Sequence, residues 1–130
     1  MKTQVIVDKL TRIIICTAFA SGRMHDFRLF KNSNTQILPQ IQAKTDTGYL
    51  GIKKFHSNTE MSVKRSKYHP LTADAKQYNR TISSQRSTNE HAIGFLKRFK
   101  IIAERYRNRR KRYGLRLNLL AGICNFDLSI

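Results

Sequence analysis

The sequence predicts a mixed α/β fold, and three observations lead to that prediction. Two β-rich runs, residues 4–7 and 13–19, flank a short polar connection, a pattern typical of an antiparallel hairpin. Apolar residues recur at helical spacing in two later segments, residues 72–82 and 90–106. The chain has 130 residues, of which 40% are hydrophobic, and this is enough for one domain with a modest core.

The first half of the chain predicts two strands, a helix and a third strand. The run at residues 13–19 is apolar on both faces, so we expect it to be covered on both sides. Gly22 ends this strand, and Asp26 is expected to be the N-cap or the first-turn acid of a short helix. A further apolar run ends at Asp46, where Thr47 and Gly48 turn the chain.

The second half predicts one short strand and three helices. Residues 60–63 are expected to form the strand, and Thr72 is expected to cap a helix that runs through Ile82. Residues 90–106 predict a single helix and residues 115–128 predict a last apolar helix. The apolar stripe expected on the helix at 90–106 consists of Ile93, Leu96, Phe99, Ile102 and Ala103.

The charge of the chain restricts its partners. There are 25 Lys and Arg residues against 8 Asp and Glu, a net charge of +17. Such a field attracts polyanions, so nucleic acid is the leading expected partner and an anionic membrane the second. A basic ribosomal-type protein would have the same composition.

The cysteines and the hydropathy point to a cytoplasmic protein. Cys16 and Cys124 lie far apart and form no zinc-binding cluster. We expect both to be buried apolar residues in a reducing compartment. No apolar stretch approaches the length of a transmembrane helix.

Two carboxylates stand out as candidate metal ligands. Two divalent ions about 4 Å apart catalyse phosphodiester hydrolysis well, and Mg²⁺ prefers carboxylate oxygens. Asp46 and Glu90 suit this role in an acid-poor chain. Each has a simpler interpretation: Asp46 as a turn residue before Gly48, and Glu90 as part of a Ser87-x-x-Glu90 capping box.

Basic residues follow Glu90. Gly94 and Lys97 lie at i+4 and i+7 from Glu90, so they share its helix face. Gly94 leaves room for a phosphate, and Lys97 is either a phosphate ligand or an ordinary solvated lysine. A cationic run follows, with two tyrosines that can stack or pack, and its arginines predict polyanion binding. They are Arg105, Arg107, Arg109, Arg110 and Arg112.

The ordered set of motifs resembles a known family. The motifs include Gly22-Arg23-x-His25-Asp26-Phe27-x-Leu29-Phe30-Lys31, Asp46-Thr47-Gly48-Tyr49-x-Gly51-Ile52 and Glu90-His91-x-Ile93-Gly94-x-Leu96-Lys97. Together they resemble bacterial insertion-sequence transposases of the DDE superfamily, insertion-sequence-five-like and related to harbinger-type nucleases. Each motif alone is weak, whereas their order along nearly the whole chain is specific.

The resemblance implies an α/β, RNase H-like mixed sheet flanked by helices and the cleavage and joining of DNA with Mg²⁺ or Mn²⁺. It places Asp46 on the second catalytic aspartate of the family and Glu90 on its catalytic glutamate. Arg86 and Lys97 fall on basic positions that accompany this glutamate. Asp8 and Asp26 match other family positions, so neither is expected to replace the first catalytic aspartate.

In the family, the first catalytic aspartate lies on a central strand upstream of the motif that begins here at Lys2. The resemblance therefore implies that residues 1–130 are the C-terminal portion of a catalytic domain with an incomplete sheet. Residues 1–52 would hold the strands and first helix, residues 53–89 a basic insertion and helix, and residues 90–130 the glutamate-bearing helix and basic C-terminal helical region. Either a truncated copy or one frame of a split gene would give such a chain.

Two functions follow as expectations. The first is a transposase fragment that is marginally folded and inactive alone, whose partners are DNA and either the upstream half of a split transposase or further copies of itself. The second is a non-catalytic basic protein that binds DNA or RNA. Both predict a cytoplasmic, nucleoid-associated protein without a membrane partner.

Overall fold

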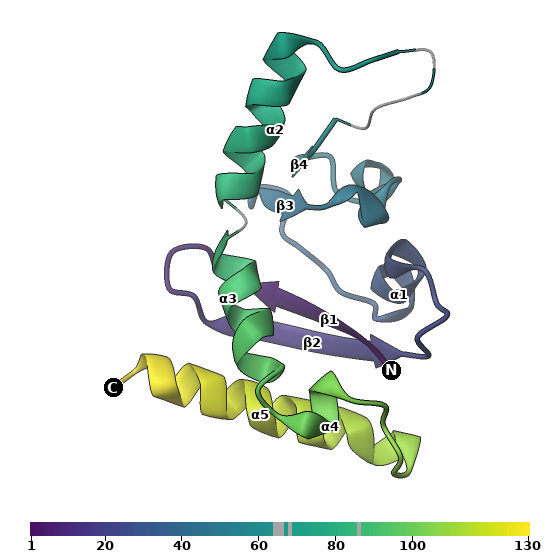
Figure 1. Ribbon diagram of the computed structural model, residues 1–130, viewed down its shortest axis with the longest axis vertical. Coiled ribbons are helices and arrows are strands. Elements are labelled where there is room, and N and C mark those ends of the chain that lie inside the picture. The colour runs from purple at the N-terminus through teal and green to yellow at the C-terminus, as the bar shows by residue number, and fades with distance from the viewer. Residues whose placement is uncertain (64–66, 68, 86) are drawn as a thin grey trace. The chain divides into compact units, whose positions relative to one another are not determined.

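The fold is mixed α/β, as the sequence predicts, and the computed structural model describes residues 1–130 except 64–66, 68 and 86. The chain divides into two units (Figure 1). The terminal unit joins Met1–Met24 with Thr88–Ile130, and the central unit is His25–Ser87. Each unit is described by itself below.

The terminal unit begins with the predicted hairpin. Strand β1 (Lys2–Val7) pairs antiparallel with β2 (Ile14–Ala20). The connecting turn is held by the carboxylate of Asp8, which accepts hydrogen bonds from the backbone N–H groups of Leu10 at 2.8 Å and Thr11 at 3.2 Å. The prediction of an antiparallel hairpin around a short polar connection is therefore confirmed.

The last helix, α5 (Tyr113–Leu128), packs against this hairpin (Figure 1). The side chain of Asn125 accepts a hydrogen bond from the N–H of Ile14 at 2.8 Å and donates one to the carbonyl of Ile14 at 3.0 Å. At the other end of α5, the hydroxyl groups of Tyr113 and Thr3 are 2.8 Å apart. These polar contacts fix α5 along the strands at both of its ends.

The core of the terminal unit lies between the hairpin and the helices. Helix α3 (Ser87–Leu96) and the short α4 (Lys100–Ala103) contribute to it together with α5. Burial of such apolar side chains is the main stabilising term of a small domain. The buried members are Ile14, Ala92, Leu96, Tyr113, Leu117, Leu120, Ala121 and Cys124.

The prediction of one helix over residues 90–106 is wrong, because the chain breaks between α3 and α4. Tightened turns close α3, with hydrogen bonds from Arg98 N to Phe95 O at 3.1 Å and from Phe99 N to Leu96 O at 3.2 Å. Phe99 is then extended, with φ −91° and ψ 122°. The redirected chain lets Phe99 pack against the core, while Ile93 of the predicted stripe is exposed.

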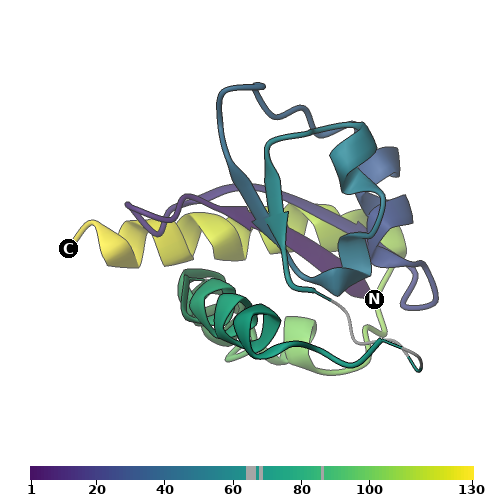
Figure 2. The same cartoon turned by 90° about the horizontal axis from the view of Figure 1, so that it is seen from above.

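The central unit contains α1 (Asp26–Asn32), β3 (Ala43–Thr45), β4 (Thr59–Met61) and α2 (Ala73–Gln85). Strands β3 and β4 are parallel (Figure 2). Two 3₁₀ turns, η1 (Thr47–Tyr49) and η2 (Ile52–Lys54), lie between them in the chain. The strand predicted at residues 60–63 is thus β4, which begins one residue earlier and ends at Met61.

The N-termini of α1 and α2 test two of the predicted helix caps. At α2 the hydroxyl of Thr72 accepts a hydrogen bond from the N–H of Ala75 at 3.1 Å, which confirms the predicted cap. At α1 the N-cap is His25, whose ring nitrogen accepts from the N–H of Phe27 at 3.4 Å. Asp26 is therefore the first-turn acid, the second of the two roles expected for it.

The expectation that β2 is covered on both faces is wrong. Ile15 is 64% exposed and Cys16 is also exposed, whereas Ile14 and Cys124 are buried. The strand is therefore covered at Ile14 and open at Ile15 and Cys16, and the expectation that both cysteines are buried is wrong for Cys16. Among the described helices, none has both the length and the hydropathy needed to cross a membrane.

Candidate functional site

Asp46 lies where β3 ends and η1 begins, in the central unit. Its backbone is extended and its Oδ1 accepts a hydrogen bond from the N–H of Gly48 at 2.9 Å. The side chain is exposed. Asp46 thus has the turn role that its spacing predicts, and this role leaves the carboxylate at the surface.

A second carboxylate, Asp26 in the first turn of α1, lies beside the same turn. A Cβ atom added to Gly48 would lie 2.5 Å from Asp26 Oδ2 and 3.1 Å from Asp46 Oδ1. The two acids therefore flank the α-carbon of Gly48, and only glycine leaves room between them. Sequence reasoning missed this pair, because nothing in the spacing of the two aspartates indicates that α1 packs against η1.

Tyr49 is influenced by the charges of both carboxylates. Burial, then the charges of Asp26 and Asp46, raise the pKa of Tyr49 to about 12. Its ring packs edge-on against Phe30 of α1, with centroids 6.4 Å apart. The phenol therefore loses its proton at a higher pH than an exposed tyrosine does.

The second glycine of the motif is Gly51, and its backbone conformation explains why a glycine is needed there. It has φ +98°, a left-handed conformation that favours glycine. A Cβ at Gly51 would also lie 2.9 Å from the ring of Phe27 in α1. Both glycines of the Gly-aromatic-x-Gly motif are thus required by the close approach of α1 to the η1–η2 segment.

Glu90 lies in the first turn of α3, in the terminal unit, and its side chain is exposed. Among the described residues, no hydrogen bond joins Ser87 to Glu90. The structure therefore does not form the predicted capping box. Gly94 has open space around its α-carbon, and Lys97, which follows the last residue of α3, is exposed.

The predicted ligands belong to different units, Asp46 to the central one and Glu90 to the terminal one. Their convergence on one metal therefore stays a prediction. The donor set is suitable for Mg²⁺ or Mn²⁺, since the carboxylates of Asp26 and Asp46 supply the hard oxygens that these ions prefer. In the described ranges, no group of three or more His, Cys, Asp or Glu residues forms a metal site. Arg86 lies outside the described residues.

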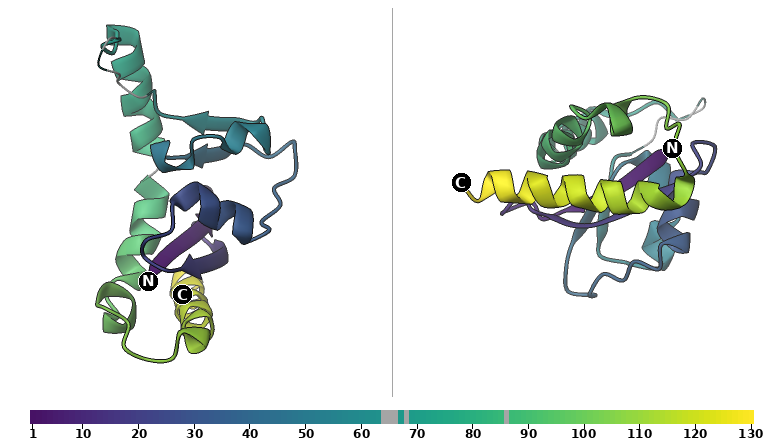
Figure 3. Two further views of the ribbon diagram at one scale, coloured as in Figure 1. Left: turned by 90° about the vertical axis from the view of Figure 1, so that its right-hand side faces the viewer. Right: turned by 90° about the horizontal axis from the view of Figure 1, so that it is seen from below.

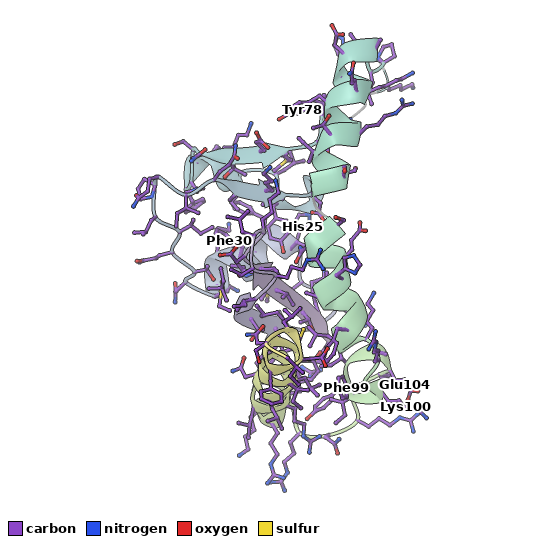
Figure 4. All side chains as sticks on the ribbon, turned by 90° about the vertical axis from the view of Figure 1, so that its left-hand side faces the viewer. His25, Phe30, Tyr78, Phe99, Lys100 and Glu104 are labelled. Atoms are coloured by element: carbon purple, nitrogen blue, oxygen red, sulfur yellow. The ribbon has the colours of Figure 1, made fainter. Side chains whose placement is uncertain are left out.

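The predicted cationic run is a loop in the terminal unit that contains η3 (Arg110–Arg112) and precedes α5. We call residues 104–112 the basic loop. In Figure 4, Phe99 points toward α5, whereas Lys100 and Glu104 lie on the outer side of the chain as it enters the basic loop. All the predicted phosphate-binding arginines of the loop are exposed, namely Arg105, Arg107, Arg109, Arg110 and Arg112.

The two tyrosines of the run pack and do not project. Tyr113 is 1% exposed, and the ring of Tyr106 meets it edge-on with centroids 4.9 Å apart. The hydroxyl of Tyr106 donates to the carbonyl of Arg109 at 3.2 Å and accepts from the guanidinium of Arg116 at 3.3 Å. Of the two roles left open by the sequence, the structure shows packing.

Comparison with known proteins gives two matches. A family model described as DDE superfamily endonuclease matches residues 1–125. The chain is 42% identical, over all of its 130 residues, to a protein of Microchaete diplosiphon described as a probable transposase for insertion sequence element IS702. It covers 47% of the length of that relative. No solved structure matches the chain.

Proposed function

Because the chain belongs to the DDE superfamily of endonucleases, we propose that it is part of the catalytic domain of a DNA transposase. The observation that carries the proposal is the extent of the family match, which includes Asp46, Glu90 and the basic loop. The proposed reaction is metal-dependent cleavage and joining of DNA strands. The proposed substrate is the DNA of the nucleoid, in the cytoplasm.

The proposed metal ligands are Asp46 and Glu90, with Asp26 as an addition from the structure. The bound Mg²⁺ or Mn²⁺ would supply positive charge to the reacting phosphate and activate the attacking oxygen. Gly48 N–H holds Oδ1 of Asp46 at 2.9 Å, so the carboxylate has a fixed position before any ion binds. Asp26 enters the proposal because it is the acid that lies beside Asp46 in the same unit.

The proposed DNA contacts are exposed cations. Lys97 follows the last residue of α3 and is exposed, and the basic loop carries five exposed arginines. Guanidinium groups bind phosphate oxygens in a bidentate manner, which positions the backbone without reading its sequence. Arg86 is retained as a proposed DNA ligand on the resemblance alone.

The chain spans about half the length of its relative, so catalysis by a whole transposase is itself part of the proposal. We propose that residues 1–130 form the C-terminal portion of an RNase H-like catalytic domain, with the divisions 1–52, 53–89 and 90–130 given above. The first catalytic aspartate and its central strand would lie in the other portion. Alone, the chain is expected to bind DNA without cleaving it.

Titration with Mn²⁺, followed by the loss of its free-ion electron paramagnetic resonance signal, tests the metal site. The parent should bind Mn²⁺, and Asp46→Ala and Glu90→Ala should each weaken that binding by about tenfold or more. Asp74→Ala is the matched control, since Asp74 is an exposed acid at the start of α2 in the central unit. The site assignment is wrong if both variants bind Mn²⁺ as the parent does. A parent that binds DNA but no Mn²⁺ would favour a non-catalytic DNA- or RNA-binding protein.

A further inference from the structure

Helix α5 has an exposed apolar stripe on the side opposite its buried face. Leu115 is 73% exposed and Phe126 is 67% exposed, and Leu119 and Ile123 between them are also exposed. Their spacing of three and four residues places them on one face of the helix. We call these four residues the outer stripe.

The buried face of α5 lies half a turn away and carries Tyr113, Leu117, Leu120, Ala121 and Cys124. A helix that is apolar on opposite faces is typical of one enclosed on both sides. Arg116 and Asp127 are the only charged residues within α5. The stripe is therefore a contiguous apolar surface, which marks an interaction site more often than scattered exposed leucines do.

The outer stripe is rigidly presented. Asn125 forms two hydrogen bonds with the backbone of Ile14, at 2.8 and 3.0 Å, and Tyr113 is fully packed at the other end of the helix. Figure 3 shows α5 lying along the hairpin of the terminal unit, as one continuous helix. The exposed leucines are thus held outward by a fixed helix, which lowers the entropy cost of binding a partner.

Two facts indicate what covers the stripe. The relative contains about twice as much polypeptide as this chain, since the match covers 47% of it. A second copy of this chain would carry the same net charge of +17, and like charges of this size repel. We infer that the outer stripe is the docking face for the portion of the transposase polypeptide that this chain does not match. This inference rests on the proposed function, whose relative supplies that portion.

The test uses the unmatched portion of the Microchaete diplosiphon transposase as the probe. Sedimentation velocity should show a one-to-one complex between the probe and the full 130-residue chain. The double variant Leu115→Glu/Leu119→Glu should weaken the complex by about tenfold or more, because it places two charges in an apolar interface. The matched control is Leu10→Glu, in the hairpin turn, since Leu10 is 91% exposed but lies outside α5; it should bind as the parent does.

Circular dichroism melting checks that the double variant folds, and Leu119→Gln serves as a milder second variant. The inference is overturned if the parent does not bind the probe, or if the Leu115/Leu119 variants bind it as the parent does. It is also overturned if the parent alone is a dimer that the double variant turns into a monomer, since the occupant is then a second copy. An Asp46→Ala/Glu90→Ala variant should retain the complex, so failure of the metal site and failure of docking are distinguishable.

Discussion

The phenol hydroxyl of Tyr106 donates a hydrogen bond to the backbone carbonyl of Arg109 at 3.2 Å, across one turn of the basic loop. The same hydroxyl accepts a bond from Arg116 of α5, and the ring packs on the buried Tyr113. Tyr106 therefore connects two positions of the basic loop and also anchors the loop to the core. The arginines around it are exposed while their backbone is held in place.

Replacing Tyr106 by Phe should weaken DNA binding without changing its salt dependence. The variant keeps the ring contact but loses the two hydroxyl bonds, each worth about 1 kcal/mol. We expect a loss of about fivefold in affinity for duplex DNA, measured by fluorescence anisotropy at several salt concentrations. Tyr78→Phe is the control, since Tyr78 is an exposed tyrosine on α2 of the central unit and is not part of the basic loop. Equal affinity of parent and Tyr106→Phe would contradict a positioning role.

Removing loop arginines should instead change the salt dependence itself. Each phosphate contact that is lost lowers the slope of log K against log salt by about 0.9. The double variant Arg109→Ala/Arg110→Ala should therefore lower the affinity for DNA. It should also reduce the slope by the amount expected for the loss of about two phosphate contacts. The same anisotropy titrations measure this. An unchanged slope would show that these two arginines do not contact phosphate.

Substitution of Gly48 by Ala should destabilise the acid pair, because the new methyl group would lie 2.5 Å from Asp26 Oδ2. We expect a loss of about 1–3 kcal/mol in the free energy of unfolding, measured by urea denaturation. Asp26→Ala should restore part of this loss in the Gly48→Ala background, because it removes the clashing carboxylate.

Gly94→Ala is the matched control for that substitution. Gly94 is within α3 and has nothing within 4 Å of an added Cβ, so this variant should be more stable by roughly 1 kcal/mol. If Gly48→Ala is as stable as Gly94→Ala, or if Asp26→Ala gives no rescue, then the two aspartates do not flank Gly48.

Tyr49 should make the central unit lose stability at high pH. The pKa of Tyr49 rises from 10.0 to about 12 on folding, through burial and through the charges of Asp26 and Asp46. Its contribution is fully present below pH 10 and is lost as the pH rises toward 12. Tyrosinate absorbance should show a late-titrating phenol that is lost in Tyr49→Phe. In Asp46→Asn this phenol should titrate earlier; an unchanged titration would contradict the proximity of Asp46.

Local patterns predicted the elements well and their tertiary relations poorly. The hairpin followed from two β-rich runs, and Thr72 was identified as a cap because its hydroxyl acts within one turn. The break after Leu96 was missed because no glycine or proline marks it; it depends on how Phe99 packs against the core.

The candidate site shows the same limit. The turn role of Asp46 was predictable, since it acts on Gly48 two residues away. The proximity of Asp26 was not, because it depends on the packing of α1 against η1. The exposed arginines were predicted from the cationic run, whereas the packing of Tyr106 required knowledge of where α5 begins.

The pairing of Asn125 with Ile14 has a consequence for biosynthesis. The two residues are 111 positions apart, and the segment between them contains the whole central unit. A ribosome adds about 5–20 residues per second. The hairpin is therefore synthesised several seconds before α5, the helix that covers it. The central unit, which ends at Ser87, receives all of its residues before Asn125 is added. Translation speed, and chaperones that bind the open hairpin, will therefore influence how much of this chain reaches its native state.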